Sequence, residues 1–132
     1  MMKTFDYSLV KDSQYFKDGR MDAHSDHTYY RDGEEAQEKA TSFRYDLNGI
    51  WKFHYARNYG SAISGFEKEE YCCRDWDDIR VPAHIQMEGY DAPQYANVQY
   101  PWEGHEDIHP GEIPEHFNPV ASYVKYFEVP EE

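Results

Sequence analysis

The sequence predicts an all-β protein, namely part of a β-sandwich with long irregular loops and an extended N-terminal segment. In Ile50–Tyr55, aromatic residues occupy every second position, as in a strand with one face turned inward. Between Val81 and Pro101, three prolines and a glycine exclude a long helix or a central strand. Aromatic residues make up 17% of the chain, which is typical of a folded core and not of a disordered chain.

Length and charge restrict the function classes. At 132 residues the chain amounts to one domain or part of one. The sequence holds 26 acidic against 13 basic residues, a formal net charge of −13, which disfavours binding to nucleic acid and to anionic membranes.

Targeting signals and cysteine use favour the cytoplasm. No apolar run approaches the ~20 residues of a membrane span, and the first residues lack the apolar core of a secretory signal. Cys72 and Cys73 are adjacent, an arrangement that rarely forms a disulfide, so we expect no disulfide framework. We interpret them as a strand residue and its neighbour; the alternative is a metal pair or a reactive thiol.

The chain divides into an extended segment, residues 1–41, and a sandwich part, residues 42–132. In the first part, Ser13–Gly19 has the residues of one helical turn, with Ser13 as N-cap. Asp32–Glu35 has capping-box spacing and precedes the helix-tolerant Ala36–Ala40. Neither piece has enough apolar residues to fold alone, so we expect this segment to lie against its own sandwich or another subunit.

About four or five strands are expected in the second part; four can be placed, the second of them on a weak pattern. They are Ile50–Tyr55, Ser64–Cys73, Asp78–Val81 and Ser122–Val129. The last is apolar on both faces and therefore needs neighbours on both sides. Between the last two strands lies an irregular stretch, where Tyr90, Tyr95 and Tyr100 add apolar mass to a proline-rich loop. A long loop with this many large side chains is ordered by packing and is typical of a functional loop.

The pattern VP-x-x-x-QM-x-GYD-x-P-x-Y-x-NV-x-YP in this loop resembles a signature in the N-terminal domain of the large β-galactosidases of glycoside hydrolase family 2. It is carried by Val81, Pro82, Gln86, Met87, Gly89, Tyr90, Asp91, Pro93, Tyr95, Asn97, Val98, Tyr100 and Pro101. The LNG-x-W-x-F pattern of Leu47–Phe53 and the NP-x-x-SY pattern from Asn118 to Tyr123 agree in order and spacing. The similarity covers roughly Asp22 to Pro130.

The resemblance implies a galactose-binding-domain-like jelly roll, of which this chain holds the first part. A jelly roll needs about eight strands, so we expect a truncated fragment. The family's enzymes hydrolyse terminal β-D-galactosides such as lactose with retention, using two glutamates on a barrel downstream of this domain. The resemblance therefore implies no catalytic residue here, an inactive fragment, and Mg²⁺ and Na⁺ ligands outside this chain. The implied partners are the rest of the enzyme chain, further subunits of a homo-oligomer and the β-galactoside substrate.

Asn97 is the candidate substrate-binding residue, because it matches the asparagine that the family's first domain extends into the sugar pocket. A carboxamide both donates and accepts hydrogen bonds, which suits sugar hydroxyls. The alternative is that Asn97 satisfies loop backbone groups. Tyr95, Tyr100 and Trp102 are packing residues of the loop or, alternatively, a stacking wall for sugar rings. We interpret Asp91 as a loop clamp and not as an acid catalyst.

Clusters of acidic residues and histidines invite a metal hypothesis, chiefly in Trp102–His109 and His24–His27. Neither has the spacing of a known zinc or EF-hand site, and prolines on both sides disfavour a helix that would align His105 with His109. We therefore interpret both as solvated loops without metal. The alternative overall function is a free-standing carbohydrate-binding module, which would contain all its strands and bind galactose by itself.

Overall fold

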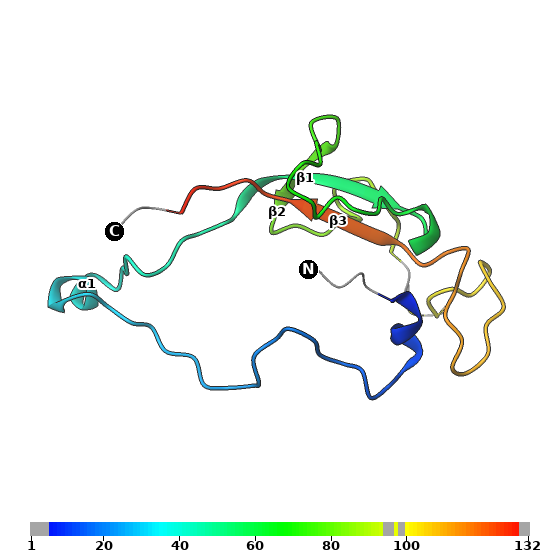
Figure 1. Ribbon diagram of the computed structural model, residues 1–132, viewed down its shortest axis with the longest axis horizontal. Helices are drawn as coiled ribbons and strands as arrows, with labels where there is room; N and C mark the ends of the chain where they lie inside the picture. Colours follow the sequence, from blue (N-terminus) through cyan, green and yellow to red (C-terminus); the bar gives the residue numbers. More distant parts are fainter. Residues whose placement is uncertain (1–5, 94–96, 98–99, 130–132) are drawn as a thin grey trace. The chain divides into compact units, whose positions relative to one another are not determined.

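The computed structural model describes residues 6–93, 97 and 100–129. The chain falls into two units, Met1–Leu47 and Asn48–Glu132, each described by itself below (Figure 1). The prediction of all-β structure is confirmed at the level of class: the second unit is built on a three-stranded antiparallel sheet, and the only α-helix of the described residues has six residues.

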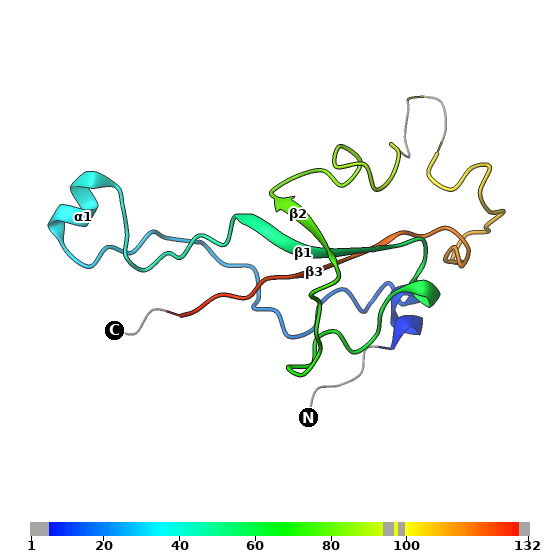
Figure 2. The same cartoon turned by 90° about the horizontal axis from the view of Figure 1, so that it is seen from above.

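The sheet consists of β1 (Gly49–Ala56), β2 (Asp77–Val81) and β3 (Val120–Val124), with β1 in the centre (Figures 1 and 2). The predicted strands at Ile50–Tyr55 and Asp78–Val81 are confirmed. The prediction for Ser122–Val129 is wrong beyond Val124, the last paired residue of β3. Lys125 instead reaches the Ile50 carbonyl oxygen with its side-chain Nζ, at 3.0 Å.

The first face of the sheet carries the aromatic side chains of β1, as the alternation predicts. Phe53 has no exposed surface, and its ring lies 4.9 Å from the ring of its cross-strand partner Tyr123. Ile79 of β2 is 2% exposed and faces Trp51 across the ladder. Burying a side chain such as Phe53 contributes about 1.5–3 kcal/mol, so the middle of β1 is the main anchor of this unit.

The second face is covered by the connection between β1 and β2. Trp76 lies here, with ring centroids 5.5 Å from His54, 5.5 Å from Phe66 and 5.8 Å from Tyr71. Its indole N–H donates to the Tyr71 hydroxyl at 3.2 Å. Lys52, also on this face, forms a 2.8 Å ion pair with its cross-strand partner Asp78. This face of the sheet is therefore partly covered, and it is only partly apolar.

The expected strand at Ser64–Cys73 is wrong. After the 3₁₀ helix η2 (Tyr59–Ser61), this stretch forms a series of turns, in which Lys68 N–H donates to Gly65 O and Tyr71 N–H donates to Lys68 O. The run of four charged residues from Glu67 to Glu70 is exposed and has no apolar face to pair with a sheet. Phe66 and Tyr71 contribute to the core through their rings, without strand pairing.

The N-terminal unit has short helical pieces and no buried residue among residues 6–47. The capping pattern at Asp32–Glu35 does begin a helix, α1 (Gly33–Glu38), which ends before the expected Ala40; the Asp32 carboxylate accepts from the backbone N–H groups of Glu34 and Glu35 at 3.0 Å. The predicted turn of helix at Ser13–Gly19 is wrong. The 3₁₀ helix η1 lies earlier, at Tyr7–Lys11, and the Asp12 carboxylate caps a tight turn by accepting from Gln14 N–H.

Candidate functional site

The long loop between β2 and β3 is the candidate site, and its first anchor is Tyr90. The Tyr90 ring packs edge-on against Phe53, with centroids 4.5 Å apart. Its hydroxyl is hydrogen-bonded to Asp77 at the start of β2, and burial, followed by the charge of Asp77, raises the pKa of Tyr90. Gly89, with φ +91°, supplies the left-handed turn that brings the tyrosine back to the sheet. The loop is therefore fastened to the middle of β1.

Asp91 is the second anchor. It is hydrogen-bonded to Tyr55 on the same face of β1, and the pKa of Tyr55 is raised by burial and by the Asp91 charge. The Asp91 carboxylate also accepts from the backbone N–H of Ala92 at 2.7 Å. These contacts confirm the interpretation of Asp91 as a loop clamp. The Gly-Tyr-Asp triplet thus fixes the root of the loop six residues before Asn97.

Asn97 lies on the exposed part of the loop. Its φ of 69° is in the left-handed region, which asparagine tolerates better than most residues. The residue is exposed, so its carboxamide is accessible to a ligand. Of the predicted stacking residues, Tyr95 lies outside the described residues, while Tyr100 and Trp102 belong to the next segment.

From Tyr100 to Glu106 the chain forms two consecutive turns. Tyr100 N–H donates to the Glu103 carboxylate, and Glu103 N–H donates to the Tyr100 carbonyl oxygen, both at 3.2 Å. Trp102, with φ 72°, offers its carbonyl oxygen to the N–H groups of His105 and Glu106 at 2.9 and 3.2 Å. No helix forms here, as the flanking prolines predict.

Glu106 binds the residues that lead into β3. Its two carboxylate oxygens accept hydrogen bonds from the backbone N–H groups of Glu115 (2.9 Å), His116 (2.9 Å) and Phe117 (3.4 Å). These hydrogen bonds hold the pKa of Glu106 below its usual value, because they stabilise the charged form. The carboxylate thus closes residues 106–117 into a loop that ends just before β3.

Next to this clamp, the imidazole of His105 stacks on Phe117, with centroids 4.1 Å apart, and the Arg57 guanidinium lies 5.4 Å from the same ring. His105 and Glu106 therefore have packing and hydrogen-bonding partners of their own. Among the described residues, no group of three or more His, Cys, Asp or Glu side chains is placed to hold a metal ion.

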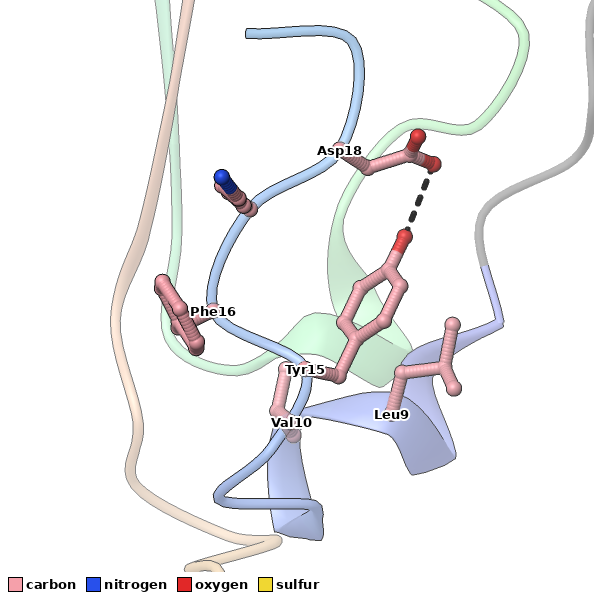
Figure 3. A pocket seen from close by; sticks show the side chains of 6 residues that line it. Leu9, Val10, Tyr15, Phe16 and Asp18 are labelled. Carbon is pink, nitrogen blue, oxygen red and sulfur yellow. Dashed lines mark hydrogen bonds between the residues drawn. The ribbon is translucent and has the colours of Figure 1, made fainter. Parts of the chain in front are cut away.

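The N-terminal unit contains a separate hollow of about 500 Å³ between η1 and the following turn (Figure 3). Leu9, Val10 and Phe16 supply its apolar lining, and the Tyr15 hydroxyl donates to Asp18 at 2.9 Å. Figure 3 shows the side chains of Tyr15 and Phe16 leaving the chain in different directions. The lining has no cluster of catalytic or metal-binding groups, so we do not consider it a catalytic site.

Sequence reasoning proposed Asn97 as a sugar-binding residue, which stays a prediction, and it singled out Asp91, but it missed Glu106 and Tyr55. The sequence pattern placed Tyr55 only on the inward face of a strand. In the structure its hydroxyl is also hydrogen-bonded to Asp91, 36 positions later. Glu106 was grouped with a solvated acidic loop, whereas it binds backbone groups nine to eleven positions later. Only the return of the chain toward β3 brings those groups together, and no local pattern indicates it.

Comparison with known proteins agrees with this architecture. Residues 44–132 match the family described as "Glycosyl hydrolases family 2, sugar binding domain". A β-galactosidase of Halalkalibacterium halodurans is 51% identical over 98% of this chain, and one of Streptococcus thermophilus is 42% identical over 91%. A β-galactosidase large subunit of Latilactobacillus sakei is 37% identical over 86% of the chain. The chain belongs to the sugar-binding domain family of the family 2 glycosyl hydrolases.

The chain spans 13%, 12% and 20% of the lengths of these three relatives.

Cys72 is exposed and Cys73 is buried, both as free thiols, and the Cys73 sulfur lies 3.4 Å from the Tyr126 hydroxyl. Within the part of the chain that the structure describes, no helix has the length and apolar character needed to cross a membrane.

Proposed function

We propose that this chain is the sugar-binding portion of a cytoplasmic β-galactosidase, in which it supports the fold, contributes to subunit contacts and forms one edge of the galactose pocket. The observation that carries this proposal is the 51% identity to a β-galactosidase along 98% of the chain. The substrate class is terminal β-D-galactosides of the lactose type, hydrolysed with retention.

In this proposal the sheet is the first part of a jelly-roll sandwich completed by further polypeptide. The strands β2 and β3 each have one neighbour in the described sheet. Beyond β3, Tyr126 and Val129 are 71% and 78% exposed, and Ile50 on β1 is 58% exposed. Further strands would cover this apolar surface.

The proposed role of Asn97 is to hydrogen-bond the galactose hydroxyls. Its carboxamide is exposed, and the loop that carries it is fixed to β1 through Tyr90 and Asp91, which limits the entropy lost on binding. A neutral amide can donate to one hydroxyl and accept from another without adding a charge to the pocket.

The chemistry is assigned to the rest of the enzyme. Retention needs two carboxyl groups about 5–5.5 Å apart, and the carboxylates characterised above, Asp91 and Glu106, are engaged with a tyrosine hydroxyl and with backbone N–H groups. The Mg²⁺ and Na⁺ expected of the whole enzyme are likewise assigned to ligands outside this chain.

Asn97→Ala, made in the β-galactosidase that contains this chain, tests the proposal. Losing hydrogen bonds worth about 1.5 kcal/mol in total should lower kcat/KM for lactose roughly tenfold. Gln37→Ala removes an exposed amide from α1 and is the matched control, expected to leave kcat/KM unchanged. Unchanged kinetics for Asn97→Ala would show that the asparagine serves only the loop backbone.

A complementation assay tests the assignment of the whole chain. The chain is mixed with a β-galactosidase lacking the corresponding segment, and hydrolysis of a chromogenic galactoside is followed. Activity in the mixture, with none from either component, is the expected result. Binding of galactose to the isolated chain at millimolar or lower concentration, without complementation, would instead favour a free-standing carbohydrate-binding module.

A further inference from the structure

Among the residues that the structure describes, Asp91 is the last one before Asn97 that is partly buried. The residues that follow it in the described part of this loop, Ala92, Pro93 and Asn97, are exposed. Asp91 therefore marks the point at which the loop leaves the support of the sheet. Any contact that sets the direction of the chain at this point also affects where Asn97 lies.

The Asp91 carboxylate joins a side chain of the sheet to the backbone of the loop. It accepts a hydrogen bond from the hydroxyl of Tyr55, which lies on the same face of β1 as Phe53. It also accepts from the backbone N–H of Ala92 at 2.7 Å, which orients the peptide that follows Asp91. Burial, and then the charge of Asp91, raise the pKa of Tyr55, so the phenol keeps the proton that it donates.

The next two residues extend this orientation along the chain. Pro93 has a fixed φ, and its ring restricts Ala92 to extended conformations. Asn97 follows four residues later, so its Cα lies at most ~14 Å from that of Pro93. Over such a length, a rotation of ~10° at the root moves a residue by up to ~2 Å, whereas a binding side chain must be held within ~0.5 Å. A change at the root can therefore move the Asn97 carboxamide away from a substrate hydroxyl.

The far end of the loop is held at the same end of the sheet. Two residues after Tyr55, the carbonyl oxygen of Arg57 accepts from the N–H of Asn118 at 3.0 Å. The Glu106 carboxylate binds the backbone of residues 115–117 next to it. In Figures 1 and 2 the yellow and orange part of the loop lies beyond this end of β1. The loop is therefore fixed on both sides of its exposed part.

We propose that Tyr55 and Asp91 are positioning residues for the hydrolytic reaction, because their hydrogen bond orients the Asn97 carboxamide toward the galactose hydroxyls. The inference rests on the proposed function, since it takes Asn97 as the contact to galactose. Neither Tyr55 nor Asp91 touches the substrate, and their effect on catalysis passes through Asn97. The hydrogen bond also occupies the Asp91 charge on the sheet.

The test is a double-mutant cycle in the β-galactosidase that contains this chain, with kcat/KM for lactose as the readout. Tyr55→Phe removes only the hydroxyl and keeps the ring on β1. It should lower kcat/KM about fivefold, the loss for one hydrogen bond, and no more than the roughly tenfold expected of Asn97→Ala. In the Asn97→Ala background, Tyr55→Phe should change kcat/KM less than about twofold, because the residue through which it acts is gone.

Two further variants separate positioning from general support of the fold. Asp91→Asn keeps an oxygen that can accept from Tyr55 and Ala92, so it should retain most of the activity that Asp91→Ala loses. Tyr71→Phe is the matched control, because it removes a hydroxyl that meets Trp76 on the other face of the sheet. It should leave kcat/KM unchanged.

The outcomes separate the two proposals. If Tyr55→Phe lowers kcat/KM equally with and without Asn97, the contact acts independently of Asn97. If Tyr55→Phe has no effect while Asn97→Ala does, the contact does not position the carboxamide. Either result overturns the inference and leaves the proposed function standing. If Asn97→Ala itself leaves kcat/KM unchanged, the proposed role of Asn97 is wrong and the inference fails with it.

Discussion

Both units of this chain are rich in large aromatic side chains, but among the residues that the structure describes, those that are buried belong to the second unit. In residues 6–47, Phe16 is 71% exposed, Phe43 is 67% exposed and no residue is buried. In the sheet unit, Phe53 is fully buried between Tyr90 and Tyr123. The two units therefore obtain their order from different interactions.

Among residues 6–47 of the first unit, the side-chain hydrogen bonds are mostly local. They are caps and turns such as Asp32 with Glu35 N–H and Asp12 with Gln14 N–H, and a further one joins the Thr41 hydroxyl to the Tyr29 carbonyl oxygen, 12 positions earlier in the sequence. Such contacts hold a short segment but do not offset the entropy of ordering it. In the second unit, partners far apart in sequence meet on β1. The difference indicates that the sheet unit sets the fold, whereas the first unit needs a surface to pack on.

The largest expected effect comes from comparing two phenylalanines. Phe53→Ala removes the centre of the first face and should lower the free energy of unfolding by about 3–5 kcal/mol. Phe16→Ala, at an exposed site in the first unit, should change it by less than about 0.5 kcal/mol. Chemical denaturation followed by tryptophan fluorescence measures both. If Phe53→Ala does not fold, Phe53→Leu provides a smaller measurable loss, and equal losses at the two sites would contradict the comparison.

The second prediction isolates the polar part of a loop anchor. Tyr90→Phe keeps the ring on Phe53 but removes the hydroxyl that meets Asp77, so we expect a loss of no more than about 1 kcal/mol. Tyr90→Ala removes both contacts and should cost more. The same denaturation experiment gives both values. If Tyr90→Phe were as harmful as Tyr90→Ala, the hydrogen bond and not the ring packing would be the main anchor.

These contrasts explain how far the sequence could predict the fold. β1 and β2 were predictable because alternation, a turn signal and Pro82 are local features that the structure preserves. Ser64–Cys73 was mispredicted because Phe66 and Tyr71 are core residues presented from turns, which a strand pattern cannot represent. The end of β3 was overestimated because apolar residues continue past the last paired position.

In the candidate site, too, local features could be predicted, whereas contacts between residues distant in sequence could not. The Asp91 clamp was predictable as a type of contact, but its partner Tyr55 was not, because the pairing depends on how the loop returns to the sheet. The sugar-binding role of Asn97 was predicted from a motif and stays a prediction, since an exposed asparagine has no local feature that indicates sugar binding. The Glu106 clamp has no sequence signal, because its partners are backbone groups.

A third prediction concerns pH and the Glu106 clamp. The folded-state pKa of Glu106 is lowered, so the charged form stabilises the loop. This stabilisation is fully present above the unfolded-state pKa and is lost as pH falls through the folded-state value. Hydrogen exchange at the Glu115 and His116 amides, corrected for intrinsic rates, should therefore show falling protection on acidification. In Glu106→Gln, protection should be low at all pH values and should not change over this range. A wild-type profile that matches the variant would exclude the clamp.

The smallest expected effect lies at the start of α1. Asp32→Ala removes the carboxylate that accepts from Glu34 and Glu35 N–H, so the first turn of the helix should fray. All three tryptophans, Trp51, Trp76 and Trp102, belong to the sheet unit, and the fluorescence-detected unfolding transition should therefore not move. Amide exchange at Glu34 and Glu35 should increase, while Asp32→Asn, which keeps a capping oxygen, should retain most of the protection. A shift of the fluorescence transition in Asp32→Ala would show that the two units unfold together and that the first unit contributes to the stability of the sheet.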